Sequence, residues 1–214
     1  MKNILATIFF FIFSFSFSQK RKAPPPSGIS YHNINKDFKP ATFNNRIKNF
    51  PFNKTSKIKF LSYNLDFKKE PIYTPPPPND SIAIRNYENR KFPVKLSDIL
   101  SDKSLEGAQQ QKNLNLIEIE ELSNIILNEC AKYTTGLINI HGCYFPRNAI
   151  LFYDENDKIF AYFEICFECG GFKSDPKKLF EHDFICEDVY NKLEKFFNKT
   201  GIKTQYIKTI NETK

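Results

Sequence analysis

The stretch from Cys143 to Cys169 constrains the fold of this 214-residue chain more than any other, and it reads CYFPRNAILFYDENDKIFAYFEICFEC. It contains two runs rich in aromatic and branched residues, 148–153 and 159–167, and such runs are typical of β-strands. The residues between them are polar, and Asn and Asp tolerate the positive φ angles that tight turns require. We therefore predict a central β-hairpin whose open end lies near the cysteines.

The position and length of the turn determine which residues of this hairpin lie opposite each other. If residues 156–157 form a two-residue turn, Ala149 lies opposite Glu164 and Arg147 lies opposite Cys166. A carboxylate on a core strand needs a partner, because an uncompensated buried charge is strongly destabilising. Arg147 lies two residues along the facing strand, so we expect a structural ion pair between Glu164 and Arg147.

Two amphipathic helices, over 116–130 and 187–198, are expected to pack against the hairpin. The first begins with Asn115 and, three residues later, Glu118, which is the pattern of a helix start with a capping box. The second carries apolar side chains at i, i+1, i+4, i+7 and i+8, counted from Val189, which gives a wide core-facing stripe. A small antiparallel sheet packed by two helices belongs to the α+β class.

The chain divides into three predicted parts. Residues 1–18 combine Lys2, an apolar run too short to span a bilayer comfortably and small residues at the cleavage point, as secretory signal peptides do. Residues 19–56 are rich in Pro, Asn and Lys without periodicity, which predicts a flexible basic linker. Residues 57–210 are expected to form a single α+β domain with a proline-rich loop near 75–78.

The net charge of +7 is unevenly distributed along the chain. Residues 19–95 carry a net charge of +11, whereas residues 96–214 carry −5. A basic arm on an acidic domain can bind an anionic surface such as lipid headgroups or polysaccharide. A compositional bias of the genome explains the same richness in Lys and Asn. Since the charges are scattered singly, we expect no specific nucleic-acid binding.

All five cysteines lie in the part of the chain that would be exported, where an oxidising environment favours disulfides. Their odd number leaves at least one thiol outside an intramolecular pair. Cys130 on the first helix is interpreted as a buried thiol. The other four converge on one end of the domain, and they are Cys143, Cys166, Cys169 and Cys186.

The first hypothesis for this cysteine cluster is structural. One disulfide would join Cys143 to Cys169 within the hairpin. Another would join Cys166 to Cys186 and so attach the hairpin to the last helix. Under this hypothesis the cysteines stabilise the fold and take no part in a reaction.

Two further hypotheses give the cluster a chemical role. A zinc site could use His141 or His182 in place of a cysteine, although structural zinc sites usually have two paired Cys-x-x-Cys knuckles and this chain has one. Thiol–disulfide exchange could take place between Cys166 and Cys169. Because these two are three residues apart, their approach requires the strand to end near residue 167.

The hairpin resembles a group of uncharacterised exported bacterial proteins with the pattern C-Y-x-P-R-N-A-I-x-F, a turn, and then E-I-C-F-x-C. In this chain the two halves of the pattern lie at 143–152 and 164–169. The group also has a later cysteine before an F-F-x-x-x-G-I ending, which Cys186 and residues 196–202 match. The resemblance implies that the four clustered cysteines and Arg147 form one site, and it implies no particular reaction.

The sequence gives little evidence of any other catalytic site. It has no Gly-rich phosphate loop, no paired acidic motif and no serine nucleophile elbow. We therefore expect an exported protein, periplasmic or secreted, that acts as a non-enzymatic disulfide-stabilised or interaction module. The alternative is a cysteine-ligated zinc site or a thiol–disulfide redox site at the open end of the hairpin.

Overall fold

The computed structural model describes residues 34–68, 77–88, 93–101, 104–133, 144–177, 179 and 186–207. The strands and helices in these ranges confirm the predicted α+β class. The predicted signal peptide over 1–18 and the first half of the proline run lie outside the described residues. Among the helices that are described, none is long and apolar enough to cross a membrane.

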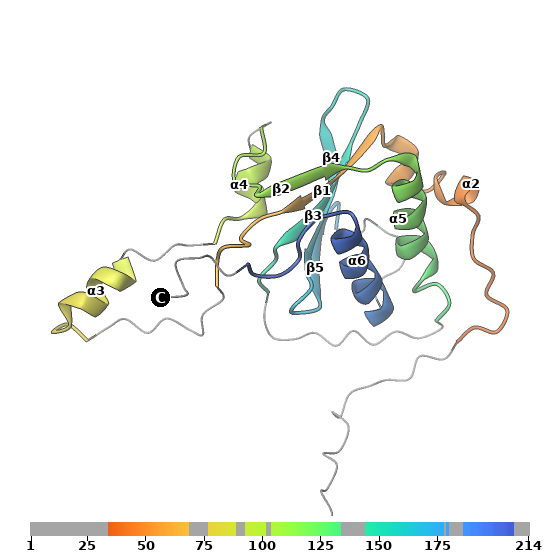
Figure 1. The fold of residues 1–214 in the computed structure, drawn as a ribbon. Coiled ribbons are helices and arrows are strands. Elements are labelled where there is room, and N and C mark those ends of the chain that lie inside the picture. Colours follow the sequence, from red (N-terminus) through yellow and green to blue (C-terminus); the bar gives the residue numbers. More distant parts are fainter. Residues whose placement is uncertain are drawn as a thin grey trace, which may run out of the picture. The chain divides into compact units, whose positions relative to one another are not determined.

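A single antiparallel sheet, with its five strands in the order β2-β1-β3-β4-β5, forms the middle of the fold (Figure 1). Its strands are β1 (Lys57–Ser62), β2 (Gln110–Asn113), β3 (Asn148–Tyr153), β4 (Ile159–Cys166) and β5 (Gly171–Asp175). The central strand β3 is buried along its whole length, which agrees with its largely apolar sequence. The edge strands β2 and β5 are short and more polar.

The predicted hairpin is formed by β3 and β4, and its register is confirmed, with Ala149 opposite Glu164. The turn differs from the predicted two-residue turn. It spans residues 154–158, where Asp157 adopts a φ of 60°, and a register irregularity at the end of β3 absorbs the difference in length. The register further along the strands is therefore the same as a two-residue turn would give.

Both predicted amphipathic helices are present close to their expected bounds, as α5 (Leu116–Asn128) and α6 (Glu187–Lys199). The capping box of α5 is formed: the Asn115 side chain accepts a hydrogen bond from the Glu118 N–H at 3.0 Å, and the Glu118 carboxylate accepts one from the Asn115 N–H at 2.9 Å. The remaining helices are shorter, and they are α2 (Phe43–Arg46), the 3-10 helix η1 (Phe52–Lys54), α3 (Ser81–Glu88) and α4 (Leu96–Ser101).

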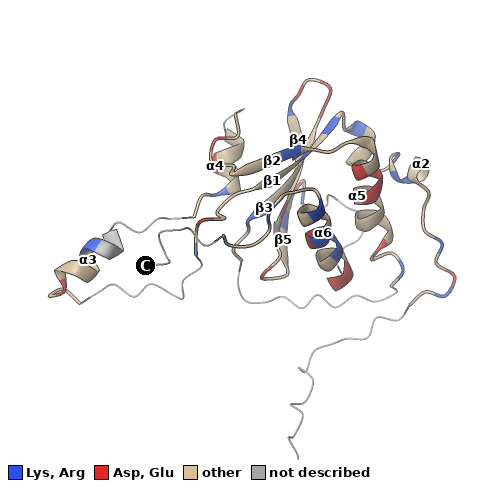
Figure 2. Cartoon of the chain, viewed as in Figure 1, with Lys and Arg blue, Asp and Glu red and all other residues tan. Residues whose placement is uncertain are grey.

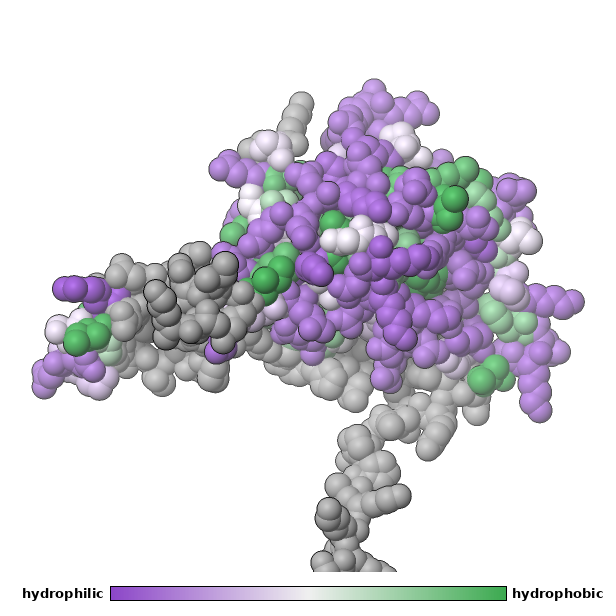
Figure 3. Space-filling model, viewed as in Figure 1, coloured by the Kyte–Doolittle hydropathy of each residue, from purple (hydrophilic) through white to green (hydrophobic). Residues whose placement is uncertain are grey.

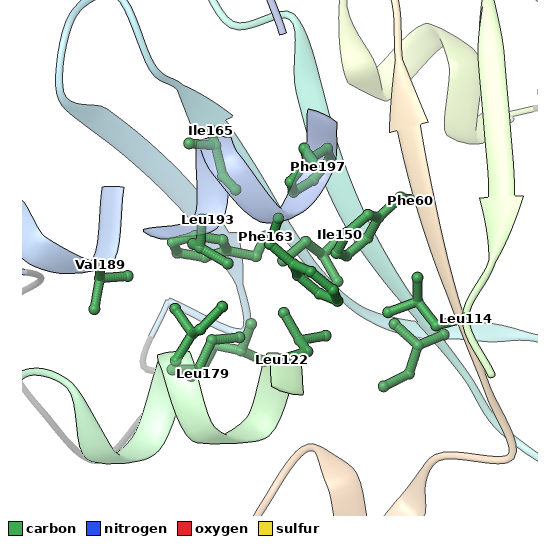
Figure 4. Close-up of a cluster of buried hydrophobic side chains, with 14 of the residues drawn as sticks. Phe60, Leu114, Leu122, Ile150, Phe163, Ile165, Leu179, Val189, Leu193 and Phe197 are labelled. Carbon is green, nitrogen blue, oxygen red and sulfur yellow. The ribbon is translucent and has the colours of Figure 1, made fainter. Parts of the chain in front are cut away.

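The larger core lies between the sheet and the helices α5 and α6. Figure 4 shows side chains from all three converging, among them Phe60, Phe163, Leu122 and Leu193. Phe60 of β1 stacks on Phe197 of α6, with ring centroids 3.9 Å apart. Full burial of one such side chain contributes about 1.5–3 kcal/mol, so this layer fixes both helices on one face of the sheet.

The opposite face of the sheet carries a smaller core. Leu61 of β1 and Leu151 of β3 pack there against Leu96 and Ile99 of α4. Alternate residues of a strand share a face, so this face of β1 also carries the residues at positions 57 and 59. Both of those residues are lysines.

The prediction of a flexible linker over 19–56 is wrong for residues 34–56, which pack against the domain. Arg46 is 5% exposed and donates hydrogen bonds to Ser123 of α5 and to two backbone carbonyl oxygens. Phe52 belongs to the larger core. One buried arginine and spaced phenylalanines hold this segment, and such isolated contacts leave no periodic pattern in the sequence.

Candidate functional site

A buried disulfide joins Cys130 to Cys186. Cys130 lies just beyond the C-terminal end of α5, and Cys186 is the N-cap residue of α6. The bond therefore ties the ends of two helices together, with Cα atoms 5.5 Å apart. In the chain-entropy treatment, a bond that closes a loop of this length stabilises the folded state by about 4 kcal/mol.

This pairing corrects the predicted one, in which Cys186 bonded to Cys166 and Cys130 was a thiol. Cys166 carries a buried thiol, which donates a hydrogen bond to the carbonyl of Phe145 at 3.2 Å and accepts one from its N–H at 3.3 Å. The difference arises because α5 and α6 lie side by side, with the end of one helix beside the start of the other (Figure 1). Helical periodicity does not determine which helix ends meet in space.

Cys169 is also disulfide-bonded. It lies in the turn after β4, where its N–H donates to the Cys166 carbonyl at 3.3 Å and Gly170 adopts a φ of 60°. β4 ends at Cys166, as the approach of these two cysteines was expected to require. Three other predicted site residues lie outside the described residues, namely Cys143, His141 and His182.

The predicted zinc site stays a prediction, because Cys143, His141 and His182 lie outside the described residues. The described ranges contain no group of three or more His, Cys, Asp or Glu side chains that could hold a metal ion. Cys169 and Cys186 are half-cystines, so neither sulfur is the thiolate that zinc requires. Among the described cysteines, Cys166 alone has a sulfur in the chemical form that binds zinc, and it is 1% exposed.

Glu164 of β4 is 7% exposed, and its carboxylate is held by two tyrosine hydroxyls. Tyr63 donates to one oxygen at 2.6 Å and Tyr144 donates to the other at 2.6 Å. Burial and the charge and hydrogen bond of Glu164 raise the pKa of both tyrosines well above the ordinary value. Both hydroxyls therefore remain protonated donors, and they solvate a carboxylate that has no ion-pair partner among the described residues.

The predicted ion pair between Arg147 and Glu164 is wrong. The Arg147 guanidinium donates to the backbone carbonyls of Asn64 and Phe67 and to the carboxylate of Glu168. Arg147 precedes β3, and its own carbonyl accepts a hydrogen bond from the N–H of Tyr63 at 2.9 Å. This contact places the arginine beside the segment that follows β1. Its guanidinium therefore donates to carbonyl oxygens of that segment and not to Glu164.

A pocket of about 360 Å³ opens onto Tyr144 and Glu164. Its walls come from the segments before α4 and β3 and from strands β4 and β5, and they are mostly apolar and aromatic with a few polar groups, as small-molecule sites are. The Lys173 ammonium lies 4.3 Å from the centroid of the Tyr144 ring. The pocket thus gathers a carboxylate, an ammonium group and aromatic rings, which together can bind a small ligand.

A second polar cluster surrounds the helix ends that the disulfide joins. The Glu129 carboxylate accepts hydrogen bonds from Lys132 and Lys192. Asp188 accepts one from Tyr133 and forms an ion pair with Lys132 at 2.9 Å. Burial acts to raise the pKa of Glu129, but the two lysines outweigh it and lower that pKa. This cluster was not predicted from the sequence, because its members come from the segment that follows α5 and from α6.

Comparison of the chain with protein-family models, with curated proteins and with solved structures gave no significant match.

Proposed function

We propose that the chain is an exported, non-enzymatic interaction module whose fold is stabilised by disulfides and which works in the periplasm or outside the cell. The observation that carries this proposal is the buried Cys130–Cys186 disulfide between the ends of α5 and α6. Disulfides persist in oxidising compartments and are rare in the cytosol. The signal peptide predicted over 1–18 leads to the same compartment.

The remaining cysteines support a second disulfide. The chain has five cysteines; Cys130 and Cys186 are bonded to each other, Cys166 carries a thiol and Cys169 is bonded. By elimination we assign Cys143 as the partner of Cys169. The hairpin register predicts the same pairing, since it places these two residues at one end of adjacent strands. The proposed protein therefore has two disulfides and one thiol.

The interaction role rests on pockets and not on a broad apolar surface. The face visible in Figure 3 is mostly hydrophilic, with small apolar areas between polar side chains. In the Glu164 pocket, tyrosine hydroxyls engage both carboxylate oxygens. A carboxylate held in this way is suited to binding a ligand, because the two hydrogen bonds fix its orientation.

Thiol counting and metal analysis test the proposal on protein purified from an oxidising compartment. We expect one thiol per denatured chain and no stoichiometric zinc. Four or five thiols with stoichiometric zinc would overturn the proposal in favour of a cysteine-ligated metal site.

Two variants serve as controls for the count. Cys166→Ala should reduce it to zero, because this substitution removes the one thiol. Cys143→Ala should raise it to two, because Cys169 loses its assigned partner. A count of one in both variants would show that the disulfides are paired differently.

A further inference from the structure

Two lysines occupy positions on the face of β1 that α4 partly covers. Along this face β1 carries Lys57, Lys59 and then Leu61, which is fully buried in the smaller core. Both lysines are half-buried, and an ammonium group that loses part of its hydration needs a compensating partner. Inward-pointing lysines often protect an exposed edge strand from pairing with another chain. This explanation does not apply to Lys59, because β1 is paired there with both β2 and β3.

The positive charge at this place is only partly balanced. Lys57 forms an ion pair with Asp157 of the turn between β3 and β4. The Lys59 ammonium donates to the neutral side-chain oxygen of Gln111 at 3.0 Å, and no carboxylate of the described residues lies within ion-pair distance of it. Burial and the charge of Lys57 lower the pKa of Lys59, against a smaller opposing effect of Asp157. The Asp157 carboxylate balances one of the two ammonium groups, so the site keeps a net positive charge.

A pocket of about 620 Å³ opens over these lysines. It lies between Leu100 at the end of α4 and the loop that joins β3 to β4, from which both Asp157 and Lys158 line it. Figure 2 shows Lys and Arg segments, in blue, on the sheet and on this loop, which also carries Asp and Glu segments, in red. The Lys57 and Lys59 ammonium groups lie 4.3 and 5.7 Å from the centroid of the Tyr153 ring, which orients both toward one place.

We propose that this pocket binds a small organic ester of a tetrahedral oxyanion, that is, of phosphate or sulfate. The ammonium groups of Lys57, Lys59 and Lys158 would hold the oxyanion, since three point-charge donors match its terminal oxygens. The organic portion would lie against Leu100 and Ile159, the apolar residues of the lining. The pocket volume lies within the range of about 300–1,000 Å³ that is usual for small-molecule sites.

Isothermal titration of the disulfide-bonded protein with phenyl phosphate, phenyl sulfate and inorganic phosphate tests this proposal. We expect saturable binding of one ester per chain, and the comparison of the two esters identifies the oxyanion. Inorganic phosphate should bind at least several-fold more weakly, because it makes no contact with the apolar wall. The failure of all three probes to bind, or equal affinity for inorganic phosphate and both esters, would overturn the proposal.

Lys59→Gln should weaken ester binding by about tenfold or more, because a close charge pair contributes more than about 1.4 kcal/mol in a partly desolvated site. The matched control is Lys195→Gln on the exposed side of α6, which changes the net charge equally and should leave the affinity within about twofold. If Lys59→Gln fails to fold, Lys158→Gln in the exposed loop tests the same contact. Equal losses in the pocket variant and in Lys195→Gln would show binding by net charge alone and would overturn the proposal. The thiol count is independent of this outcome.

Discussion

Tyr63 and Tyr190 form a matched pair of buried hydroxyls. Tyr63 donates to the Glu164 carboxylate at 2.6 Å, whereas the Tyr190 hydroxyl has no hydrogen-bond partner in the described part of the chain. Tyr63→Phe removes a hydrogen bond to a charged group and should lower the free energy of unfolding by about 1.5–3 kcal/mol. Tyr190→Phe removes an unsatisfied polar atom and should leave that free energy unchanged or raise it.

Urea unfolding of both variants at pH 7 measures this difference. The two substitutions delete the same buried atom, so the volume change is the same. A loss in Tyr190→Phe as large as that in Tyr63→Phe would show that the hydrogen bond to Glu164 is not the source of the stability.

The importance of Glu164 was predictable from the sequence, but its partners were not. A charged residue at a core-facing position of a predicted strand demands compensation, and the alternation of side chains reveals such a position. Its donors, Tyr63 and Tyr144, come from segments beyond β1 and before β3. Arg147 was the nearest opposite charge along the hairpin, yet backbone carbonyls closer in space satisfy it.

Where the ends of α5 and α6 meet, the Glu129 carboxylate makes the free energy of unfolding depend on pH in the acidic range. Its pKa is lower in the folded chain than the value of 4.5 expected for an unfolded one. Its contribution is therefore fully present above about pH 4.5 and is lost as the pH falls through the folded-state pKa. The wild type should lose free energy of unfolding more steeply than Glu129→Gln below pH 4.5, by at most about 1.4 kcal/mol per pH unit.

Denaturant unfolding at several values between pH 3 and pH 6 measures this slope. Glu106→Gln is the control, because Glu106 is exposed and lies outside this cluster. A wild-type slope that Glu129→Gln leaves unchanged would contradict the role assigned to the two lysines.

The hairpin and both long helices were predictable because each has a strong local signal. The polar turn and the alternating apolar residues determine the register of β3 and β4, and the capping box marks the start of α5. β2 reads QQKN, and its polar residues carry no strand pattern. The Cys130–Cys186 bond depends on how the two helices pack together, and so it could not be obtained from spacing along the chain.

For the whole molecule, the folded unit extends further toward the N-terminus than composition indicates. Chains that begin at residue 19 and at residue 32 both keep residues 34–56. A chain that begins at residue 57 lacks Arg46 and Phe52 and should be less stable. Truncation of one buried Phe to Ala alone lowers the free energy of unfolding by about 3–5 kcal/mol. Thermal and denaturant unfolding of the three chains measures the difference. Equal stability of the chains that begin at 32 and 57 would contradict the packing of residues 34–56.

The place of β1 inside the sheet has a consequence for how the chain is synthesised. β1 pairs with β3 from Lys57 opposite Tyr153 to Ser62 opposite Asn148, and these partners leave the ribosome far apart in time. Pairing with β2 alone gives two strands, which are marginal in water, so the sheet cannot close before β3 has emerged. Such long-range pairing also folds slowly. The growing chain therefore cannot complete this sheet until more than half of it has been synthesised.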